Sequence, residues 1–241
     1  MLYEKPIISV ITVCLNAEKT IEKTLRSVAS QRSEKNVIEH IVVDGASSDN
    51  TLKIINSQSN IKFVSEKDKG IYDAMNKGAS MASGQYLCFL NADDWFEPNA
   101  LTTVIRTIQK KPNIDLFHGN MKFHKDCDKT EIKKSKFLLW TKYLRMPVYH
   151  PTCFVNSRVF CSLEGFDESF STIADYDFIL RLLEERYKTY HIDKVLTNFS
   201  SGGVSGSAST TERIDLRVKH GIPYFLSKLI VMLIDLRRIF N

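Results

Sequence analysis

Four apolar segments, each followed by a polar loop, constrain the fold of this chain more than any other feature. They cover residues 7–13, 37–43, 61–65 and 85–90, and the Val- and Ile-rich ones are typical of strands buried on both faces. Helical spacing of apolar residues separates them over 17–31, 49–56 and 71–82, and Pro98 opens another helix before a fifth strand at 114–119. This alternation predicts an α/β fold of right-handed βαβ units with a mostly parallel sheet.

The second half of the chain is less regular. We expect a hairpin or loop over 121–134, a strand over 148–155, a helix over 174–185 and a Gly- and Ser-rich loop over 200–211. Residues 214–241 have the composition of an apolar helix. We therefore predict one domain over 1–207, with halves 1–120 and 121–207, and a helical extension over 208–241.

Polar side chains follow each of the first four expected strands. Asn16 follows the first strand, Asp44 the second, Asp68 the third, and the pair Asp93 and Asp94 the fourth. Because the carboxyl ends of parallel strands line one crevice, these side chains should converge there. Clustered carboxylates suit Mg²⁺ or Mn²⁺, usually with substrate phosphates completing the coordination. The alternative is that each aspartate only caps the helix that follows it.

Several classes of function are disfavoured by what the sequence contains. Neither GxGxxG nor GxxxxGK[ST] occurs, which argues against a dinucleotide cradle or a Walker-type phosphate loop. The net charge is a mild +5, and the basic residues are dispersed, so we expect no nucleic-acid partner. Five cysteines without a CxxC pair, and an N-terminus unlike a secretory signal, favour a cytoplasmic protein with buried thiols.

Three long segments and three short ones resemble family 2 glycosyltransferases of the GT-A fold. The long segments are 6–31, 39–51 and 65–95, and the short ones are HPTCFVNSRVF (150–160), GFDESF (165–170) and ADYDFILRL (174–182). The resemblance is closest to bacterial enzymes that build surface polysaccharides. It implies inverting transfer of a sugar from a nucleotide-sugar, with UDP as the expected nucleotide. The expected acceptor is a hydroxyl of a glycan or lipid-linked saccharide.

The resemblance also assigns the nucleotide-sugar site within residues 1–120. Thr12, Leu15 and Asn16 are expected to border the nucleotide. Asp44 matches the aspartate that binds the base, and Asp68 falls in the loop beside the nucleoside.

A divalent metal is the cofactor that the resemblance implies. Asp93 is expected to face the ribose and Asp94 the metal. Apart from the resemblance, His150 is a candidate ligand of the metal or of the diphosphate, and the alternative is a structural role. Such a metal stabilises the growing charge on a nucleoside diphosphate leaving group.

The catalytic base is expected in ADYDF, within the acceptor-side half 121–207. Asp175 matches the base of the family's paired acidic motif, but Ala174 stands where the first acid of that pair belongs, so Asp177 is the alternative. A carboxylate there would take the proton from the attacking hydroxyl. Without the resemblance, both acids could instead complement the helix dipole.

Two further points are left open by the sequence. Residues 221–241 are apolar, with basic interruptions, and fit either an anionic membrane surface or a packed interface such as a homodimer. The protein would then lie peripherally at the inner face of the membrane or remain free of it. Alternative functions are a sugar nucleotidyltransferase and a non-catalytic nucleotide-sugar-binding module.

Overall fold

The computed structural model describes residues 5–32, 38–125, 129–135, 142–200 and 208–239. The first half alternates strands and helices, in the order β1 (Ile8–Cys14), α1 (Ile21–Ala29), β2 (Ile38–Asp44), α2 (Thr51–Asn56), β3 (Lys62–Ser65), α3 (Ile71–Met81), β4 (Tyr86–Phe89), β5 (Trp95–Phe96) and α4 (Ala100–Lys110). The second half follows as β6 (Leu116–His124), β7 (Thr130–Lys133), the 3₁₀ turn η2 (His150–Thr152), β8 (Phe154–Asn156), α5 (Ser157–Ser162), α6 (Ala174–Glu184), β9 (Thr189–Ser200), α7 (Thr210–Lys219) and α8 (Tyr224–Ile239).

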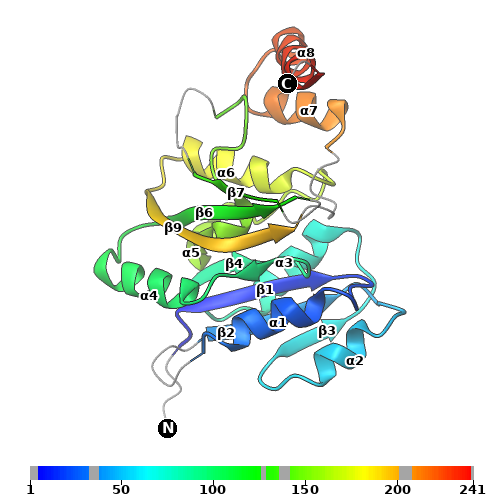
Figure 1. Cartoon of the computed structure of the whole chain (residues 1–241). Helices are drawn as coiled ribbons and strands as arrows, with labels where there is room; N and C mark the ends of the chain where they lie inside the picture. The colour runs from blue at the N-terminus through cyan, green and yellow to red at the C-terminus, as the bar shows by residue number, and fades with distance from the viewer. Residues whose placement is uncertain (1–4, 33–37, 126–128, 136–141, 201–207, 240–241) are drawn as a thin grey trace.

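The strands form a single mixed sheet in the order β3-β2-β1-β4-β8-β6-β9-β5, with β7 paired to β6 (Figure 1). The pairs β1–β2, β1–β4, β2–β3 and β6–β9 are parallel. β8 runs antiparallel between β4 and β6, and β5 and β7 are antiparallel additions. The predicted α/β class with a mostly parallel sheet is confirmed.

Alternate residues of the central strands enter two separate cores, as burial on both faces requires. In β1, Ile11 and Val13 pack on the side of α3, α5 and α6, whereas Ile8 and Val10 pack on the side of α1 and α4. Gly78 brings α3 close to the sheet, because a Cβ there would lie 2.4 Å from Ile11 Cγ2. The sheet is thus a rigid layer between helices.

The second half differs from the expected elements in two places. Residues 148–155 do not form one strand, because Pro151, which lacks an N–H, sits in the η2 turn before the short strand β8. The twelve-residue strand β9 was not predicted, because its polar and charged residues interrupt the apolar alternation. The hairpin over 121–134 is confirmed by the pairing of β6 with β7.

The C-terminal extension is a pair of packed helices rather than one helix. α7 ends at Lys219, and the chain turns at Gly221, whose φ of 81° suits a residue without a side chain; Pro223 follows before α8 begins. Figure 1 shows α7 and α8 at one end of the molecule, beyond α6. The expected boundary after residue 207 borders a segment, 201–207, outside the described residues. Within the described chain, no helix is long and apolar enough to cross a bilayer.

Candidate functional site

Two adjoining cavities lie at the carboxyl ends of the strands. The first, here named the strand-end cavity, measures about 580 Å³ and is lined by the loops that follow β1, β3 and β4. The second, here named the central cavity, measures about 380 Å³ and lies between α3, η2, α6 and α7. Ile71 and Asn91 line both cavities. The two spaces therefore adjoin at these residues.

Four of the predicted nucleotide-binding residues line the strand-end cavity: Leu15, Asn16, Asp68 and Asp93. Leu15 presents 59% of its side chain to solvent, an apolar surface beside polar loops. Asn16 has a left-handed backbone, with φ of 49°, and its Oδ1 accepts a 2.8 Å hydrogen bond from the Ser48 N–H. That bond ties the loop after β1 to the loop after β2.

Asp68 depends on the glycine across from it. Its Oδ1 accepts a hydrogen bond from the Gly70 N–H, which shapes the turn before α3. Its Oδ2 would lie only 2.5 Å from a Cβ built on Gly45. A glycine at 45 therefore lets the Asp68 carboxylate sit against the loop that follows β2.

The two remaining predicted nucleotide contacts are buried behind the cavity wall. Asp44 is fully buried, and its oxygens accept from the Ser47 N–H and from the hydroxyls of Ser47 and Ser65. Thr12 is also fully buried, with its hydroxyl 3.0 Å from His40 Nε2. In this structure Asp44 holds the ends of β2 and β3 together, and neither side chain is among those that line the strand-end cavity.

The adjacent acids after β4 have different environments. Asp93 lines the strand-end cavity, and burial raises the pKa of its carboxyl group. Asp94 is fully buried, and its pKa is raised well above the ordinary value by burial and by the neighbouring Asp93 charge. The Ser200 N–H donates to Asp94 Oδ1, while Oδ2 is buried without a hydrogen-bond partner among the described residues. Asp93 is thus the acid that the cavity exposes.

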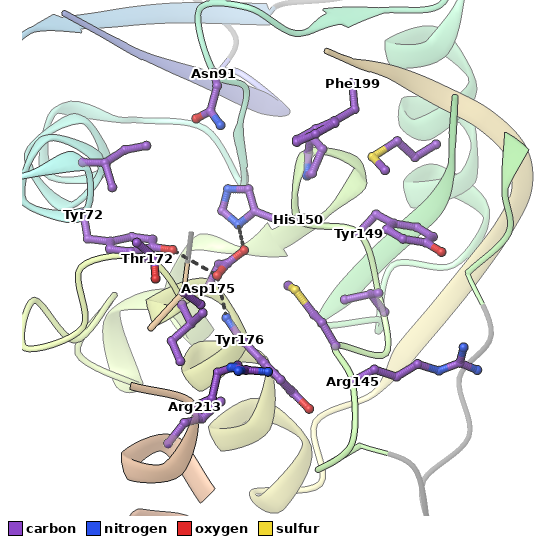
Figure 2. Close-up of a pocket in the computed structure, with 18 of the residues that line it drawn as sticks. Tyr72, Asn91, Arg145, Tyr149, His150, Thr172, Asp175, Tyr176, Phe199 and Arg213 are labelled. Atoms are coloured by element: carbon purple, nitrogen blue, oxygen red, sulfur yellow. Dashed lines mark hydrogen bonds and ion pairs between the residues drawn. The ribbon is translucent and has the colours of Figure 1, made fainter. Parts of the chain in front are cut away.

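Asp175 is the acid of the central cavity (Figure 2). It lies in the first turn of α6, where its Oδ1 accepts from the Tyr72 hydroxyl at 3.0 Å and from the Tyr176 N–H at 2.9 Å. Its Oδ2 lies 3.6 Å from His150 Nδ1. Burial and the Asp175 charge raise the pKa of Tyr72, so this phenol stays protonated and keeps donating.

His150 lies between Asn91 and Asp175 in Figure 2. Burial lowers its pKa, against the opposing effect of the Asp175 charge, which favours a neutral ring. In the part of the chain that the structure describes, its Nε2 is buried without a hydrogen-bond partner, and the same holds for Asn91 Oδ1. Two buried polar atoms near the junction of the cavities thus have unused hydrogen-bonding capacity in the described structure.

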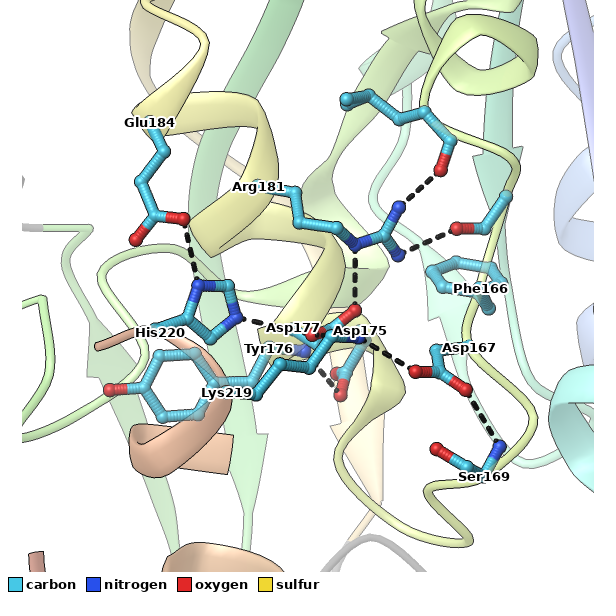
Figure 3. Close-up of polar contacts among 12 residues, drawn as sticks. Phe166, Asp167, Ser169, Asp175, Tyr176, Asp177, Arg181, Glu184, Lys219 and His220 are labelled. Carbon is cyan, nitrogen blue, oxygen red and sulfur yellow. Dashed lines mark hydrogen bonds and ion pairs between the residues drawn. The ribbon is translucent and has the colours of Figure 1, made fainter. Parts of the chain in front are cut away.

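Both carboxylate oxygens of Asp177 contact basic side chains outside the central cavity (Figure 3). It is completely buried, and its Oδ2 accepts from Arg181 Nε at 2.7 Å. Its Oδ1 lies 2.7 Å from Lys219 Nζ and 3.1 Å from His220 Nε2. These bonds outweigh burial and lower the pKa of Asp177. Asp177 thus joins α6 to the end of α7 and is not among the residues that line the central cavity.

Sequence reasoning missed two cavity residues and the ion pair that holds Arg213. Tyr72 and Asn91 lie within residues 65–95, but no pattern in the sequence indicates which way their side chains point. Arg213 lines the central cavity from α7, where Asp235 of α8 holds its guanidinium by two hydrogen bonds of 2.7 and 2.6 Å. A contact between two helices of the extension has no local sequence signal.

The sequence model described as "Glycosyl transferase family 2" matches residues 9–164, well over half of the chain. The chain belongs to this glycosyltransferase family. An uncharacterized glycosyltransferase of Mycobacterium tuberculosis is 33% identical over 184 residues, which cover 73% of this chain and 68% of the relative.

Solved glycosyltransferase structures share the fold of this family member. S. aureus TarS in complex with UDP-GlcNAc superposes with a TM-score of 0.72 at 20% identity, over 93% of this chain and 70% of that one. A mannosyltransferase of Pyrobaculum calidifontis, in complex with GDP-Man and Mn²⁺, gives 0.67 at 15% identity, over 95% and 70%. The expected GT-A fold is thereby confirmed.

Proposed function

We propose that this glycosyltransferase transfers a sugar, with inversion, from a UDP-linked donor to a hydroxyl of a glycan or lipid-linked saccharide. The observation that carries the proposal is the position of Asp175 in a cavity that adjoins the strand-end cavity at Asn91. A nucleotide in the strand-end cavity would place its sugar towards this junction, within reach of an acceptor in the central cavity. The donors of TarS and of the mannosyltransferase differ in their base, so UDP remains the point to test.

Asp175 has the surroundings of a general base. Tyr72 and the Tyr176 N–H occupy its Oδ1, which leaves Oδ2 to take the proton as the acceptor oxygen attacks the anomeric carbon. We assign His150 to orienting this carboxylate through Nδ1, rather than to binding the metal. Asp177 is excluded from the base role in this proposal because Arg181, Lys219 and His220 already hold it.

The residues at the junction fit a divalent metal in part. In the described ranges, no group of three or more His, Cys, Asp or Glu side chains could hold a metal ion unaided. Asp93 and the unpartnered Asn91 Oδ1 are oxygen donors that would hold Mg²⁺ or Mn²⁺ together with donor phosphates. The metal would stabilise charge on the departing diphosphate. We therefore place Asp93, rather than the buried Asp94, towards the metal, and the mannosyltransferase complex with Mn²⁺ supports a metal in this fold.

The division of the chain follows the same geometry. We propose residues 1–120 as the nucleotide-sugar half, 121–207 as the acceptor-side half and 208–241 as an extension. Tyr72, Asp175 and Arg213 line one cavity from the three parts in turn. The extension therefore contributes to the acceptor side and is more than an appendage.

Calorimetric titration with UDP, GDP and CDP, each with and without Mn²⁺, tests the donor side. Metal-dependent binding of UDP alone is expected, and tight binding of GDP or CDP instead would overturn the UDP assignment. Asp175→Asn tests the base: turnover should fall by about 100-fold or more while UDP affinity stays unchanged. A folded protein that binds no nucleotide would overturn the donor site, and one that binds UDP without any turnover would favour a non-catalytic module.

A further inference from the structure

The outward side of α8 carries a continuous stripe of large apolar side chains. Phe225 is 80% exposed, Leu233 55% and Met232 52%. The stripe, here named the α8 stripe, comprises Phe225, Leu226, Leu229, Met232, Leu233 and Leu236, all of them exposed. Their spacing of three and four residues puts them on one side of the helix. An apolar surface of this kind on one element marks an interaction site.

The other side of the helix is already occupied. Val231 is buried against the protein, and the Ser227 hydroxyl donates to the Ile214 carbonyl of α7. Ile234 lines the central cavity. The stripe is therefore not a face that the described protein could cover by a small rotation of α8.

Charge decides which partner the stripe fits. α8 has a single acid, Asp235, and that acid is held by Arg213. Lys228 is exposed beside the stripe, and Arg237 and Arg238 follow it in the sequence. The sequence of α8 therefore combines exposed apolar side chains with more basic than acidic residues, the combination with which an interfacial helix binds anionic lipid. A second copy would bring the same positive charge to the same face.

The helix also connects this surface to the site. Ile234 lines the central cavity and Asp235 holds Arg213, which lines the same cavity. We propose that the α8 stripe seats the protein on an anionic lipid bilayer. The central cavity then lies next to the headgroup region, so the acceptor is carried on a membrane lipid. The choice of acceptor rests on the proposed function; the membrane contact does not.

Vesicle co-sedimentation of the full chain tests the membrane contact without any sugar transfer. The protein should sediment with vesicles of phosphatidylcholine containing phosphatidylglycerol, less with phosphatidylcholine alone, and less in high salt. Replacing two stripe residues, Leu229→Ser with Leu233→Ser, should weaken binding by about tenfold or more, because less apolar surface enters the bilayer. Ile132→Ser, at a 56% exposed side chain of β7, is the matched control and should bind as the unchanged protein does.

Two results would overturn the proposal. One is a protein that stays in the supernatant when it is mixed with anionic vesicles. This includes the case in which ultracentrifugation shows that the unchanged protein is a dimer and the stripe variant a monomer. The other is a stripe variant that binds vesicles as well as the control. UDP titration of the same preparations separates this failure from failure of the donor site. A stripe variant that keeps turnover on a water-soluble acceptor, but loses it on a vesicle-borne lipid acceptor, would support the lipid-linked class.

Discussion

Asp175 and Asp177 are separated by one residue of α6, yet their carboxylates serve different parts of the protein. Residues two apart on an α-helix point about 200° apart, so one acid faces the central cavity and the other faces α7. Asp175 keeps Oδ2 towards the cavity, whereas both oxygens of Asp177 are bound by cations. This arrangement supports the proposed role of Asp175 as the base and gives Asp177 a structural role.

Asp177→Asn should destabilise the protein strongly. It would leave Arg181, Lys219 and His220 close together without the buried charge that they share. We expect the free energy of unfolding, measured by urea denaturation, to fall by about 3 kcal/mol. Asp175→Asn is the matched variant on the same helix and should lose turnover with a change below about 1 kcal/mol. Reversal of the two results would make Asp177 the base.

Tyr72→Phe tests how the base is held. The variant loses the 3.0 Å hydrogen bond to Asp175 Oδ1 but keeps the ring. Turnover should fall by about tenfold, since a net hydrogen bond to a charged group contributes about 1.5 kcal/mol or more. UDP affinity should not change, because Tyr72 lines the central cavity and not the strand-end cavity. Equal losses in turnover and UDP affinity would point instead to a general disturbance of α3.

Gly45→Ala should weaken nucleotide binding. The new Cβ would lie 2.5 Å from Asp68 Oδ2, so the carboxylate must leave its position beside the strand-end cavity. We expect UDP affinity to fall by about tenfold, the loss of one charged hydrogen bond. A double-mutant cycle with Asp68→Ala supplies the control. Once Asp68 is truncated, the substitution at 45 should have little further effect, and additive losses would remove Asp68 from the explanation.

Acid should destabilise the fold through two buried histidines. Burial lowers the pKa of His40 to about 3 and that of His118 to about 4, with smaller contributions from Arg32 and His191. Histidines in the unfolded chain have pKa values of about 6.5, so below this pH the unfolded chain binds more protons than the folded protein does. The contribution of these histidines to stability is therefore full above pH ~6.5 and falls as the pH drops towards 4.

Urea denaturation at about pH 7 and pH 5 measures this effect. We expect a loss of about 1–2 kcal/mol per histidine between these values. His40→Gln removes one titrating group while keeping a partner for Thr12, so it should reduce the loss by about half. An unchanged loss in that variant would show that other groups control the acid sensitivity.

The sequence was most informative where local pattern and tertiary environment agree. The parallel strands, the α6 helix and the loops holding Asn16, Asp68 and Asp93 follow from periodicity and from the geometry of α/β sheets. It was least informative where a distant partner decides the outcome. Ser47 and Ser65 donate hydrogen bonds to the buried Asp44, and the N–H of Ser200 in β9 donates one to the buried Asp94. No spacing within the loops distinguishes such an acid from one that a cavity exposes.

Strand β9 has a consequence for how the chain folds during synthesis. It lies between β6 and β5, although some ninety residues of chain separate it from β5. Until β9 leaves the ribosome, β5 lacks its partner and β6 presents an open edge with unpaired backbone groups. Pairings of such long range form late and leave edges exposed to aggregation. A fragment ending near residue 120 should therefore not behave as an independent nucleotide-binding domain. This holds even though the fragment contains every residue that lines the strand-end cavity except Ser171.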